Sequence, residues 1–250
     1  MAKTLTGNSR KREERLQNLM LSRQIARFER RIMGEIRRTM RAAASVDADL
    51  NQIEQMHRER MGRLLLSLHE SSARQFAEYI ALSFAAPKKL PVMATPIMDA
   101  VLVDFASKYG SELITNIIVR KTITDIKQII EAGINDGLSE IETARLIRAV
   151  APTKSASRAQ TIARTETHAA ANWGSLEAVK ATGINFKREW LAGADKRTRT
   201  THIEADGQIR GLYEPFQIGA ASLMYPGEYT GNHPEETINC RCVIAYIPAD

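Results

Sequence analysis

Apolar residues recur at helical spacing through the first third of the chain. Between residues 11 and 40 there is no proline and a single glycine, so nothing interrupts a helix. The apolar positions are Leu16, Leu19, Met20, Ile25, Phe28, Ile32, Ile36 and Met40. This pattern predicts a helix of about 30 residues, roughly 45 Å long, with a narrow apolar seam. A second helical pattern covers residues 47–84 and is most apolar at residues 64–68.

Prolines and glycines divide the remaining helical region. A linker, APKKLPVMATP, is expected at residues 86–96, and a third helical region at 97–136. A turn at Asp136-Gly137 is followed by Ser139 and Glu142, which have the spacing of a capping box and predict a short helix. Residues 155–182 predict one more helix or a helix pair, and Gly183 ends this pattern.

The character of the chain changes after Gly183. Four of the eight prolines and six of the fourteen glycines lie there, and the run CVIAYIP near the end is typical of a strand. The predicted class is therefore α+β, with long helices in the amino-terminal two-thirds and a small, loop-rich α+β module at the carboxy terminus. We expect a basic long-helix region at 1–90, a helical linker region at 91–136 and the module at 137–250.

Composition narrows the functional classes. No apolar run approaches eighteen residues and the first residues lack the apolar centre of a signal peptide, so neither a membrane span nor classical export is expected. Synthesis in the cytoplasm is the expectation. The two cysteines are too few for a disulfide framework.

The positive charge is concentrated at the amino terminus. Residues 1–41 hold 12 Lys/Arg against 4 Asp/Glu, whereas residues 42–250 hold 23 against 25. This asymmetry favours a phosphate-rich or acidic partner, and the alternative is a solvated arginine-rich helix face. The candidate residues for binding DNA or a protein surface are Arg23, Arg27, Arg30, Arg31, Arg37 and Arg38.

Both cysteines lie in one tetrapeptide, NCRC, at residues 239–242. If this segment is a strand, Cys240 and Cys242 face the same side and Arg241 the other. Two thiols on one side suit a soft metal such as zinc, with His202 as a third ligand and His233 or Asp195 as a fourth. The alternative is a pair of partly buried, reduced thiols.

The same region offers an alternative enzymatic interpretation. Asp195, His202, Glu204 and Asp206 supply carboxylates and an imidazole for metal-dependent phosphodiester cleavage. No recognisable catalytic motif accompanies them. The competing interpretation is structural, with the aspartates bonding to turn backbones and Arg197 and Arg199 holding the loops.

Three other histidines lie in predicted helices. His168 is expected to cap or pack at the edge of the module rather than to act in catalysis. His57 and His69 are assigned to charged helix faces, with no chemistry expected of either.

An ordered set of motifs connects these residues. ARTETHAAANWGSLEAVKATG is followed by WLAGADKRTRTTH, DGQ, a phenylalanine, YPGE and NCRC. Over residues 137–246 this order resembles the Mu F-like family of phage head morphogenesis proteins, also called minor head proteins. The matching positions are Arg164, Thr165, Glu166, Trp190, Asp195, Arg197, Thr198, Arg199, His202, Asp206, Gly207, Phe216, Tyr225, Pro226, Gly227, Asn239, Cys240, Arg241 and Cys242.

One motif departs from the family pattern. After YPG the family has Asp-Pro, whereas this chain has Glu228 followed by Tyr-Thr-Gly-Asn-His. The departure concerns the conformation of this loop.

The resemblance implies a non-enzymatic virion component of the phage head, present in several copies near the portal vertex and made in the host cytoplasm. The portal protein, other head proteins and packaged DNA are its implied partners, and head assembly or DNA delivery is its implied role. The alternative from another class is a metal-dependent nuclease or other DNA-processing enzyme centred on Asp195, His202 and Asp206. Zinc is the one cofactor that the residues suggest.

Overall fold

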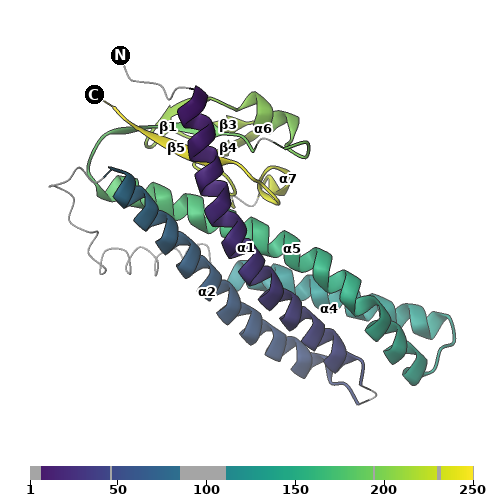
Figure 1. Ribbon diagram of the computed structural model, residues 1–250. Helices are drawn as coiled ribbons and strands as arrows, with labels where there is room; N and C mark the ends of the chain where they lie inside the picture. Colours follow the sequence, from purple (N-terminus) through teal and green to yellow (C-terminus); the bar gives the residue numbers. More distant parts are fainter. Residues whose placement is uncertain (1–6, 46, 85–110, 194, 230–231, 250) are drawn as a thin grey trace. The chain divides into compact units, whose positions relative to one another are not determined.

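Long helices dominate the fold, and short strands gather near the carboxy terminus (Figure 1). The computed structural model describes residues 7–45, 47–84, 111–193, 195–229 and 232–249. Its helices are α1 (Gly7–Ala43), α2 (Leu50–Phe84), α4 (Ser111–Asn135), α5 (Glu140–Ala181), α6 (Thr200–Glu204) and α7 (Pro234–Thr237). Its strands are β1 (Phe186–Leu191), β2 (Ile209–Gly211), β3 (Phe216–Ile218), β4 (Ala221–Leu223) and β5 (Val243–Pro248). The predicted α+β class is confirmed, while the predicted linker lies outside the described residues.

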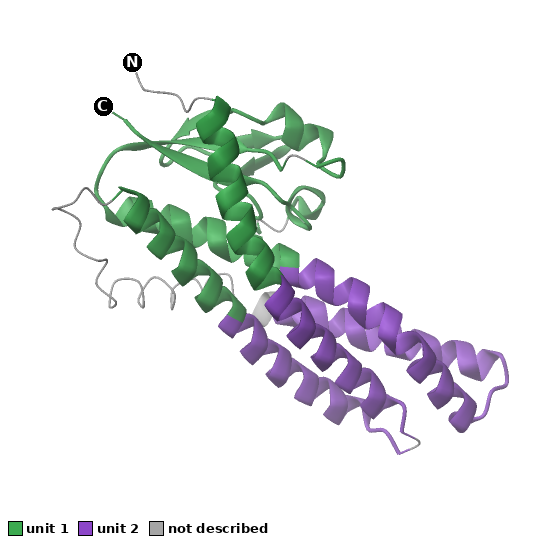
Figure 2. Ribbon diagram, viewed as in Figure 1, with its two compact units in different colours: residues 1–25, 68–104, 164–250 green, residues 26–67, 105–163 purple. Residues whose placement is uncertain are grey.

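The chain forms two compact units, each assembled from separate segments (Figure 2). Unit 1 combines residues 1–25, 68–104 and 164–250, and unit 2 combines residues 26–67 and 105–163. Helices α1, α2 and α5 therefore each contribute residues to both units. The domain ranges expected from the sequence follow chain order and stay a prediction.

The apolar seam of α1 is only partly as predicted. In its second half Phe28, Ile32, Ile36 and Met40 are buried, as the spacing indicates. In its first half Leu16 and Leu19 are 40% and 52% exposed, and Leu21 and Gln17 are buried in their place. The Gln17 amide can be buried because it donates to the carbonyl of Ile244 at 2.9 Å, a partner that only the folded chain supplies.

Local signals set several helix ends, and the turn at Asp136-Gly137 and the capping box at Ser139 are among those predicted. Asp49 Oδ1 accepts the backbone N–H groups of Asn51 and Gln52, which caps α2. Helix α4 ends at Asn135, and Gly137 in the turn that follows has a φ of 70°, in the left-handed region. The capping box of α5 is formed: the Glu142 carboxylate accepts the N–H of Ser139 at 2.8 Å, and Ser139 Oγ accepts the N–H of Glu142 at 3.3 Å.

Helix α5 is continuous, so the prediction of a short helix followed by a separate one was wrong. Pro152 lies inside it and is exposed. A proline has no backbone N–H, so at position 152 the helix lacks the hydrogen bond that would reach the carbonyl of Arg148. Because Arg148 is exposed as well, water can bind the released carbonyl and the helix can continue. The buried neighbours Ala151 and Ser155 hold the helix on its inner side.

The capping box gives a first testable prediction. Ser139→Ala removes the hydroxyl that accepts the Glu142 N–H, so one backbone N–H in the first turn of α5 loses its hydrogen-bond partner. We expect the melting temperature (Tm) to fall by roughly 2–4 °C, the effect of a lost cap in a chain of this size. Calorimetry measures it. Ser157→Ala, at an exposed position inside the same helix, is the control and is expected to leave Tm unchanged or slightly raised.

The strands of unit 1 form two small antiparallel sheets. One has the order β2-β1-β5, with Trp190 opposite Ile244, and the other pairs β3 with β4. A shared core joins the longer strands to the helices of the unit: Leu21, Phe76, Ala171, Leu191, Val243 and Ala245. The carboxy-terminal strands are therefore packed on the beginning of α1, although more than 200 residues separate them in sequence.

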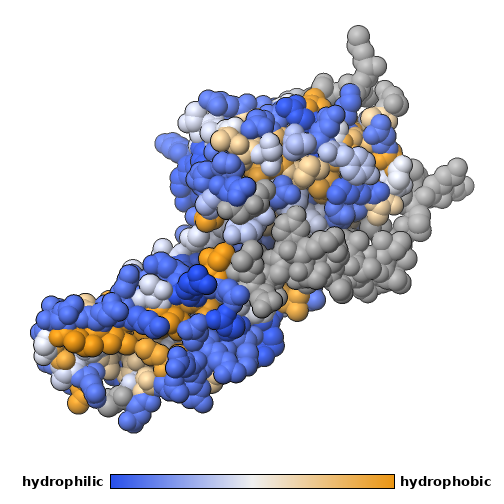
Figure 3. All heavy atoms as spheres, turned by 180° about the vertical axis from the view of Figure 1, so that it is seen from behind, coloured by the Kyte–Doolittle hydropathy of each residue, from blue (hydrophilic) through white to orange (hydrophobic). Residues whose placement is uncertain are grey.

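Unit 2 is built from α1, α2, α4 and α5. Arg158 donates to the carbonyl of Ile118 at 2.5 Å, and Arg148 donates to that of Ala44 at 2.7 Å. The surface of this unit includes apolar side chains (Figure 3), among them the exposed Ile117, Ile134 and Ile141. Within the described ranges, no helix is both long and apolar enough to cross a bilayer.

The interpretation of His57 was wrong. Its side chain is buried inside unit 2 and not on a charged surface. His57 Nδ1 lies 2.8 Å from Thr39 Oγ1 and 3.5 Å from Glu35 Oε1. The sequence places these partners on another helix, so helical periodicity within α2 could not reveal them.

Candidate metal centre

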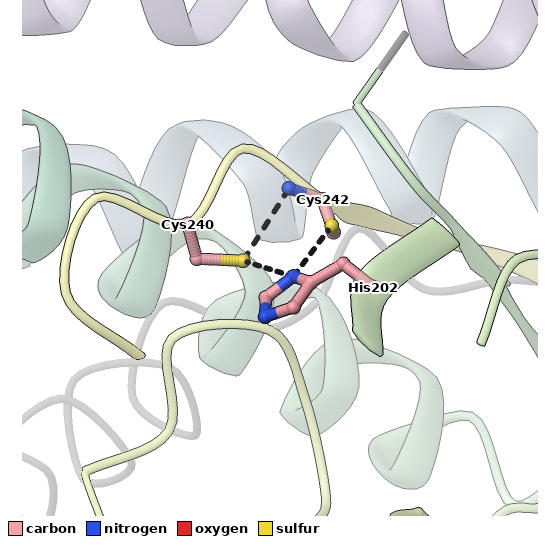
Figure 4. Close-up of side chains that lie close together, drawn as sticks. All are labelled: His202, Cys240 and Cys242. Atoms are coloured by element: carbon pink, nitrogen blue, oxygen red, sulfur yellow. Dashed lines mark hydrogen bonds between the residues drawn. The ribbon is translucent and has the colours of Figure 1, made fainter. Parts of the chain in front are cut away.

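His202, Cys240 and Cys242 form one buried cluster (Figure 4). His202 lies on α6, and the cysteines lie in the segment before β5. His202 Nδ1 is 3.2 Å from Cys242 Sγ and 3.7 Å from Cys240 Sγ, and the ligand atoms all lie within 4.8 Å of one another. Of the histidine, cysteine and carboxylate groups in the described part of the chain, this is the one set with metal-binding geometry.

The thiols converge by a different route from the one predicted. Cys240 and Cys242 precede β5, so the expectation that they lie on a strand was wrong. Asn239, with a φ of 60°, turns the chain just before Cys240, and Asn239 is a residue type that tolerates this region. The N–H of Cys242 then donates to Cys240 Sγ at 3.5 Å. Arg241 points to Asp195, at 3.4 Å between Nε and Oδ2.

Residues of the ART-E motif on α5 hold this turn. Thr165 Oγ1 accepts the N–H of Asn239 at 3.0 Å. Arg164 donates to Asn239 Oδ1 at 3.2 Å. The motif thus fixes the backbone that presents Cys240, which is a structural role for two of its residues.

The far side of the His202 ring is held by a carboxylate. His202 Nε2 lies 3.0 Å from Glu236 Oε2, which also accepts the Thr201 hydroxyl at 2.9 Å. A carboxylate accepts hydrogen bonds, so Nε2 carries the ring proton and Nδ1 presents its lone pair to the sulfurs. Trp190 packs edge-on against the ring, with centroids 5.8 Å apart.

The two thiols differ in acidity. A hydrogen bond from the Cys242 thiol lowers the pKa of Cys240, and donation of that same hydrogen bond, together with burial, raises the pKa of Cys242. The first proton to leave the pair is therefore that of Cys240. One thiolate in a buried site is the state that an incoming cation stabilises.

Two residues of α5, Asn172 and His168, contact the segments around the candidate metal centre. Asn172 donates through Nδ2 to the carbonyls of Pro226 at 3.1 Å and Cys242 at 3.4 Å. His168 is buried and bonds to the backbone of Cys242, and burial lowers the pKa of His168 to about 4. His168 is thus neutral at pH 7 and packs inside the module, in keeping with the structural role expected of it.

Glu166 has a partner that the sequence did not indicate. Its Oε2 lies 2.9 Å from His69 Nε2, and both residues are buried in unit 1. The assignment of His69 to a charged surface was therefore wrong. The pair joins the ART-E motif on α5 to α2.

The structure does not bring Asp195 and Asp206 into the cluster with His202. Asp195 Oδ1 accepts the N–H of Arg197 at 2.7 Å, which closes a turn. Asp206 Oδ1 accepts the N–H of Ala192 at 2.9 Å and bonds to Arg10 at 3.0 Å. Both carboxylates are thus engaged in holding loops.

His233, the other predicted fourth ligand, is also placed elsewhere. It precedes α7 and lies 2.9 Å from Glu235. Neither it nor Asp195 belongs to the group with metal-binding geometry.

The remaining motif residues shape the module around the cluster. Arg199 donates to the carbonyl of Ile238 at 2.6 Å, and Gly207 has a φ of 78° at the turn into β2. Phe216 packs edge-on against Trp190, with centroids 5.4 Å apart. In the YPGE loop, the Glu228 carboxylate accepts the N–H of Met224 at 2.6 Å, so the residue that departs from the family pattern closes the loop itself.

Three residues at this site were missed by sequence reasoning: Glu236, Asn172 and Arg10. Arg10 Nε lies 2.6 Å from Glu189, so the start of α1 is tied to the module by two carboxylates. Asn172 could have been noticed, because it is a polar residue in the otherwise apolar stretch HAAANWG. No spacing in the sequence could have indicated Glu236 or Arg10, since their partners lie 34 and 196 residues away.

The candidate binding arginines of α1 differ in their surroundings. Arg23, Arg27, Arg30, Arg31 and Arg38 are exposed, and Arg37 is half-buried. Arg37 donates to Ser155 at 3.1 Å, and Arg38 pairs with Glu35 at 2.8 Å. In unit 2 a shallow depression is lined by Arg30, Arg31 and Arg38 of α1 together with Arg60 and Arg63 of α2, and we call these five residues the basic face.

Comparison with known proteins extends these observations. Residues 124–245 match the model of the phage Mu protein F like family. This part of the chain is therefore similar to that family. The Mu F-like segment, residues 124–245, covers just under half of the chain and contains every family-motif residue named above. The match supports the resemblance to phage head morphogenesis proteins that the order of the motifs indicates.

Two curated proteins are similar to the chain. The NAD(+)–arginine ADP-ribosyltransferase EFV of Enterococcus faecalis is 36% identical over 138 residues, which are 54% of this chain and 26% of that protein. The uncharacterized protein YqbB of Bacillus subtilis is 28% identical over 144 residues, 56% of this chain and 47% of that protein. The chain thus spans less than half the length of either relative. No solved structure matches it.

Proposed function

We propose that the chain is a non-enzymatic minor head protein that sits near the portal vertex of a tailed phage and acts in head assembly or DNA delivery. The observation that carries the proposal is the Mu F-like segment itself. Its characteristic residues lie in unit 1, where they support one another as a scaffold: Arg164 and Thr165 hold a turn, and Asp195 and Asp206 hold loops. Residues used in this way favour an assembly module over an active site.

The basic face supplies the second half of the proposal. Arg30, Arg31 and Arg63 are exposed cations on two neighbouring helices of unit 2, and such a surface suits DNA phosphates or an acidic patch on the portal. We propose that this face contacts packaged DNA, the portal protein or neighbouring head proteins, with several copies of the chain in each virion.

Enzymatic alternatives have less support. A nuclease centred on Asp195, His202 and Asp206 requires these groups to converge, and each has separate partners. One relative is named as an ADP-ribosyltransferase, but the region that matches this chain is only 26% of that protein. That share gives no ground for assigning the activity to this chain.

The experiment is complementation in the phage that encodes the chain. With the gene deleted, wild-type protein supplied from a plasmid is expected to restore infectious particles and to be found in purified virions by mass spectrometry. Arg30→Gln/Arg31→Gln/Arg63→Gln is expected to lower the titre. Arg120→Gln/Lys127→Gln/Arg145→Gln, an equal charge change at exposed positions of α4 and α5, is the matched control and is expected to behave as wild type.

Two binding measurements identify the partner of the basic face. If the partner is DNA, the triple variant reduces the slope of log K against log salt by about 0.9 for each lost phosphate contact. If it is the portal, co-purification with portal protein is lost while DNA binding is unchanged. Absence of the protein from purified virions contradicts the proposal.

A further inference from the structure

We propose that Cys240, Cys242 and His202 bind one zinc ion, through the two Sγ atoms and His202 Nδ1, with a water molecule in the fourth position. The ion ties the segment before β5 to α6 and so stabilises the carboxy-terminal part of unit 1. This proposal is independent of the proposed function, because it concerns how the module is held together and not what it contacts.

The distances fit a zinc ion. With Zn–S bonds of about 2.3 Å and a Zn–N bond of about 2.05 Å, a tetrahedral angle places each sulfur about 3.5 Å from the nitrogen. The observed distances from His202 Nδ1 are 3.2 Å to Cys242 Sγ and 3.7 Å to Cys240 Sγ. Both nitrogen–sulfur distances are thus within a few tenths of an ångström of the tetrahedral value. The two sulfurs lie within 4.8 Å of each other, and a tetrahedral site places them about 3.8 Å apart.

The donor chemistry favours zinc over harder cations. Thiolates and an imidazole are ligands of soft and borderline metals, whereas calcium and magnesium take oxygen. Two thiolates also neutralise a divalent cation, which suits a site where Cys240, Cys242 and His202 are at most 2% exposed. His202 already presents the Nδ1 lone pair, since Nε2 is held by Glu236. A carboxylate on the second nitrogen is the usual partner of a metal-bound histidine.

The surrounding structure explains what the ion does. Helix α6 has five residues and no side-chain cap, and α7 has four. Helices this short do not persist without tertiary contacts. A metal bridge from residue 202 to residues 240 and 242 joins segments about 40 residues apart, and an ion that binds only the folded state stabilises that state by its binding free energy. A disulfide is the less suitable link, because both cysteines are free and a bond across one intervening residue is strained.

The first measurement is the metal content of the full chain. Protein purified under reducing conditions without chelator is expected to carry about one zinc per chain by mass spectrometry of the elements. Replacement by Co²⁺ is expected to give a thiolate-to-cobalt charge-transfer band and the intense visible bands of a tetrahedral site. A metal-free protein that takes up neither zinc nor cobalt overturns the proposal.

Variants then assign the ligands. Cys242→Ser and His202→Gln are expected to abolish stoichiometric zinc and the cobalt spectrum. His233→Ala is the matched control, since it removes a partly exposed histidine of the same module that lies outside the cluster, and it is expected to retain both. Glu236→Gln is expected to retain the site but weaken zinc binding by about 10–100-fold. Full zinc content in His202→Gln contradicts the assignment.

A chelator experiment on the wild-type chain avoids the risk that a variant does not fold. Removal of the metal is expected to lower Tm, and addition of one equivalent of zinc is expected to restore it, because an ion that binds only the folded state stabilises that state. An unchanged Tm after complete removal of bound zinc overturns the stabilising role.

Discussion

Gly174→Ala is expected to lower the free energy of unfolding by about 3 kcal/mol or more, at the upper end for an overpacked core. A Cβ at Gly174 of α5 lies 2.4 Å from the carbonyl oxygen of Ala73, 2.7 Å from its Cα and 2.8 Å from its carbonyl carbon. These are backbone atoms of α2, so no side-chain rotation relieves the contact. The two helices must separate, and buried apolar contacts of unit 1 are lost.

Denaturant unfolding monitored by circular dichroism measures this effect. Gly34→Ala is the control, because Gly34 is exposed inside α1 with nothing within 4 Å of an added Cβ. Helix propensity predicts that this control raises stability by up to about 1 kcal/mol. A neutral Gly174→Ala contradicts the close crossing of α2 and α5.

A pair of double variants tests the backbone origin of the effect. Ala73→Gly is not expected to rescue Gly174→Ala, because the Ala73 side chain is not the group in contact. At Gly133 of α4 the situation is reversed, since an added Cβ meets Thr143 Oγ1 at 2.5 Å. There, Thr143→Ala is expected to rescue Gly133→Ala.

Arg188→Met is expected to destabilise unit 1 by about 3 kcal/mol or more. Arg188 on β1 is fully buried and donates to the carbonyls of Gly211, Glu214 and Met224, with a distance of 2.9 Å from Nη2 to Gly211. Burial lowers the pKa of its guanidinium. Removing the donor leaves the carbonyls of Glu214 and Met224 without this partner, while the Gly211 carbonyl keeps the N–H of Glu214 at 3.2 Å. Each buried polar group that is left unsatisfied costs about 1–3 kcal/mol.

The conservative variant separates geometry from charge. Arg188→Lys keeps the charge, but a single ammonium cannot reach all the acceptors that lie around the edge of the planar guanidinium, so it is expected to recover only part of the loss. Lys187→Met changes the exposed neighbour on the same strand and is expected to have little effect. Hydrogen exchange of residues 209–224 localises the loss, which should appear there before the helices of unit 2. Uniform protection in Arg188→Met contradicts the bridging role.

Features that depend on residues close together in the sequence were predicted better than features that depend on distant residues. The capping box at Ser139 and the turn at Asp136-Gly137 were accessible because their partners lie within a few residues. The strand at 243–248 was accessible because its own run of residues is typical of a strand, although its partner β1 is distant in sequence. The separate helices expected around Pro152 were wrong, since proline removes only one helical hydrogen bond and the freed carbonyl is on the exposed side.

The candidate site shows the same division. The pairing of Cys240 with Cys242 could be expected from their separation of two residues, although the turn at Asn239 and not a strand brings it about. The contacts that hold His202 and the cysteines could not be expected from the sequence. Glu236 lies 34 residues from its partner His202, and Arg164 lies 75 residues from its partner Asn239. His57 and His69 were assigned to the wrong environment for the same reason. Each is buried, and each lies beside a carboxylate of another helix, Glu35 for His57 and Glu166 for His69.

The sequence by itself thus determined most of the helices, the capping box of α5, the α+β class and the similarity of residues 124–245 to the Mu F-like family. Each of these depends on local periodicity or on the order of short motifs. Only the tertiary structure decided that His202 faces both thiols, that Asp195 and Asp206 do not join it, and that the start of α1 belongs with the carboxy-terminal module. The physical reason is that a buried polar side chain takes whichever partner the folded chain places beside it, and no spacing in the sequence encodes that partner.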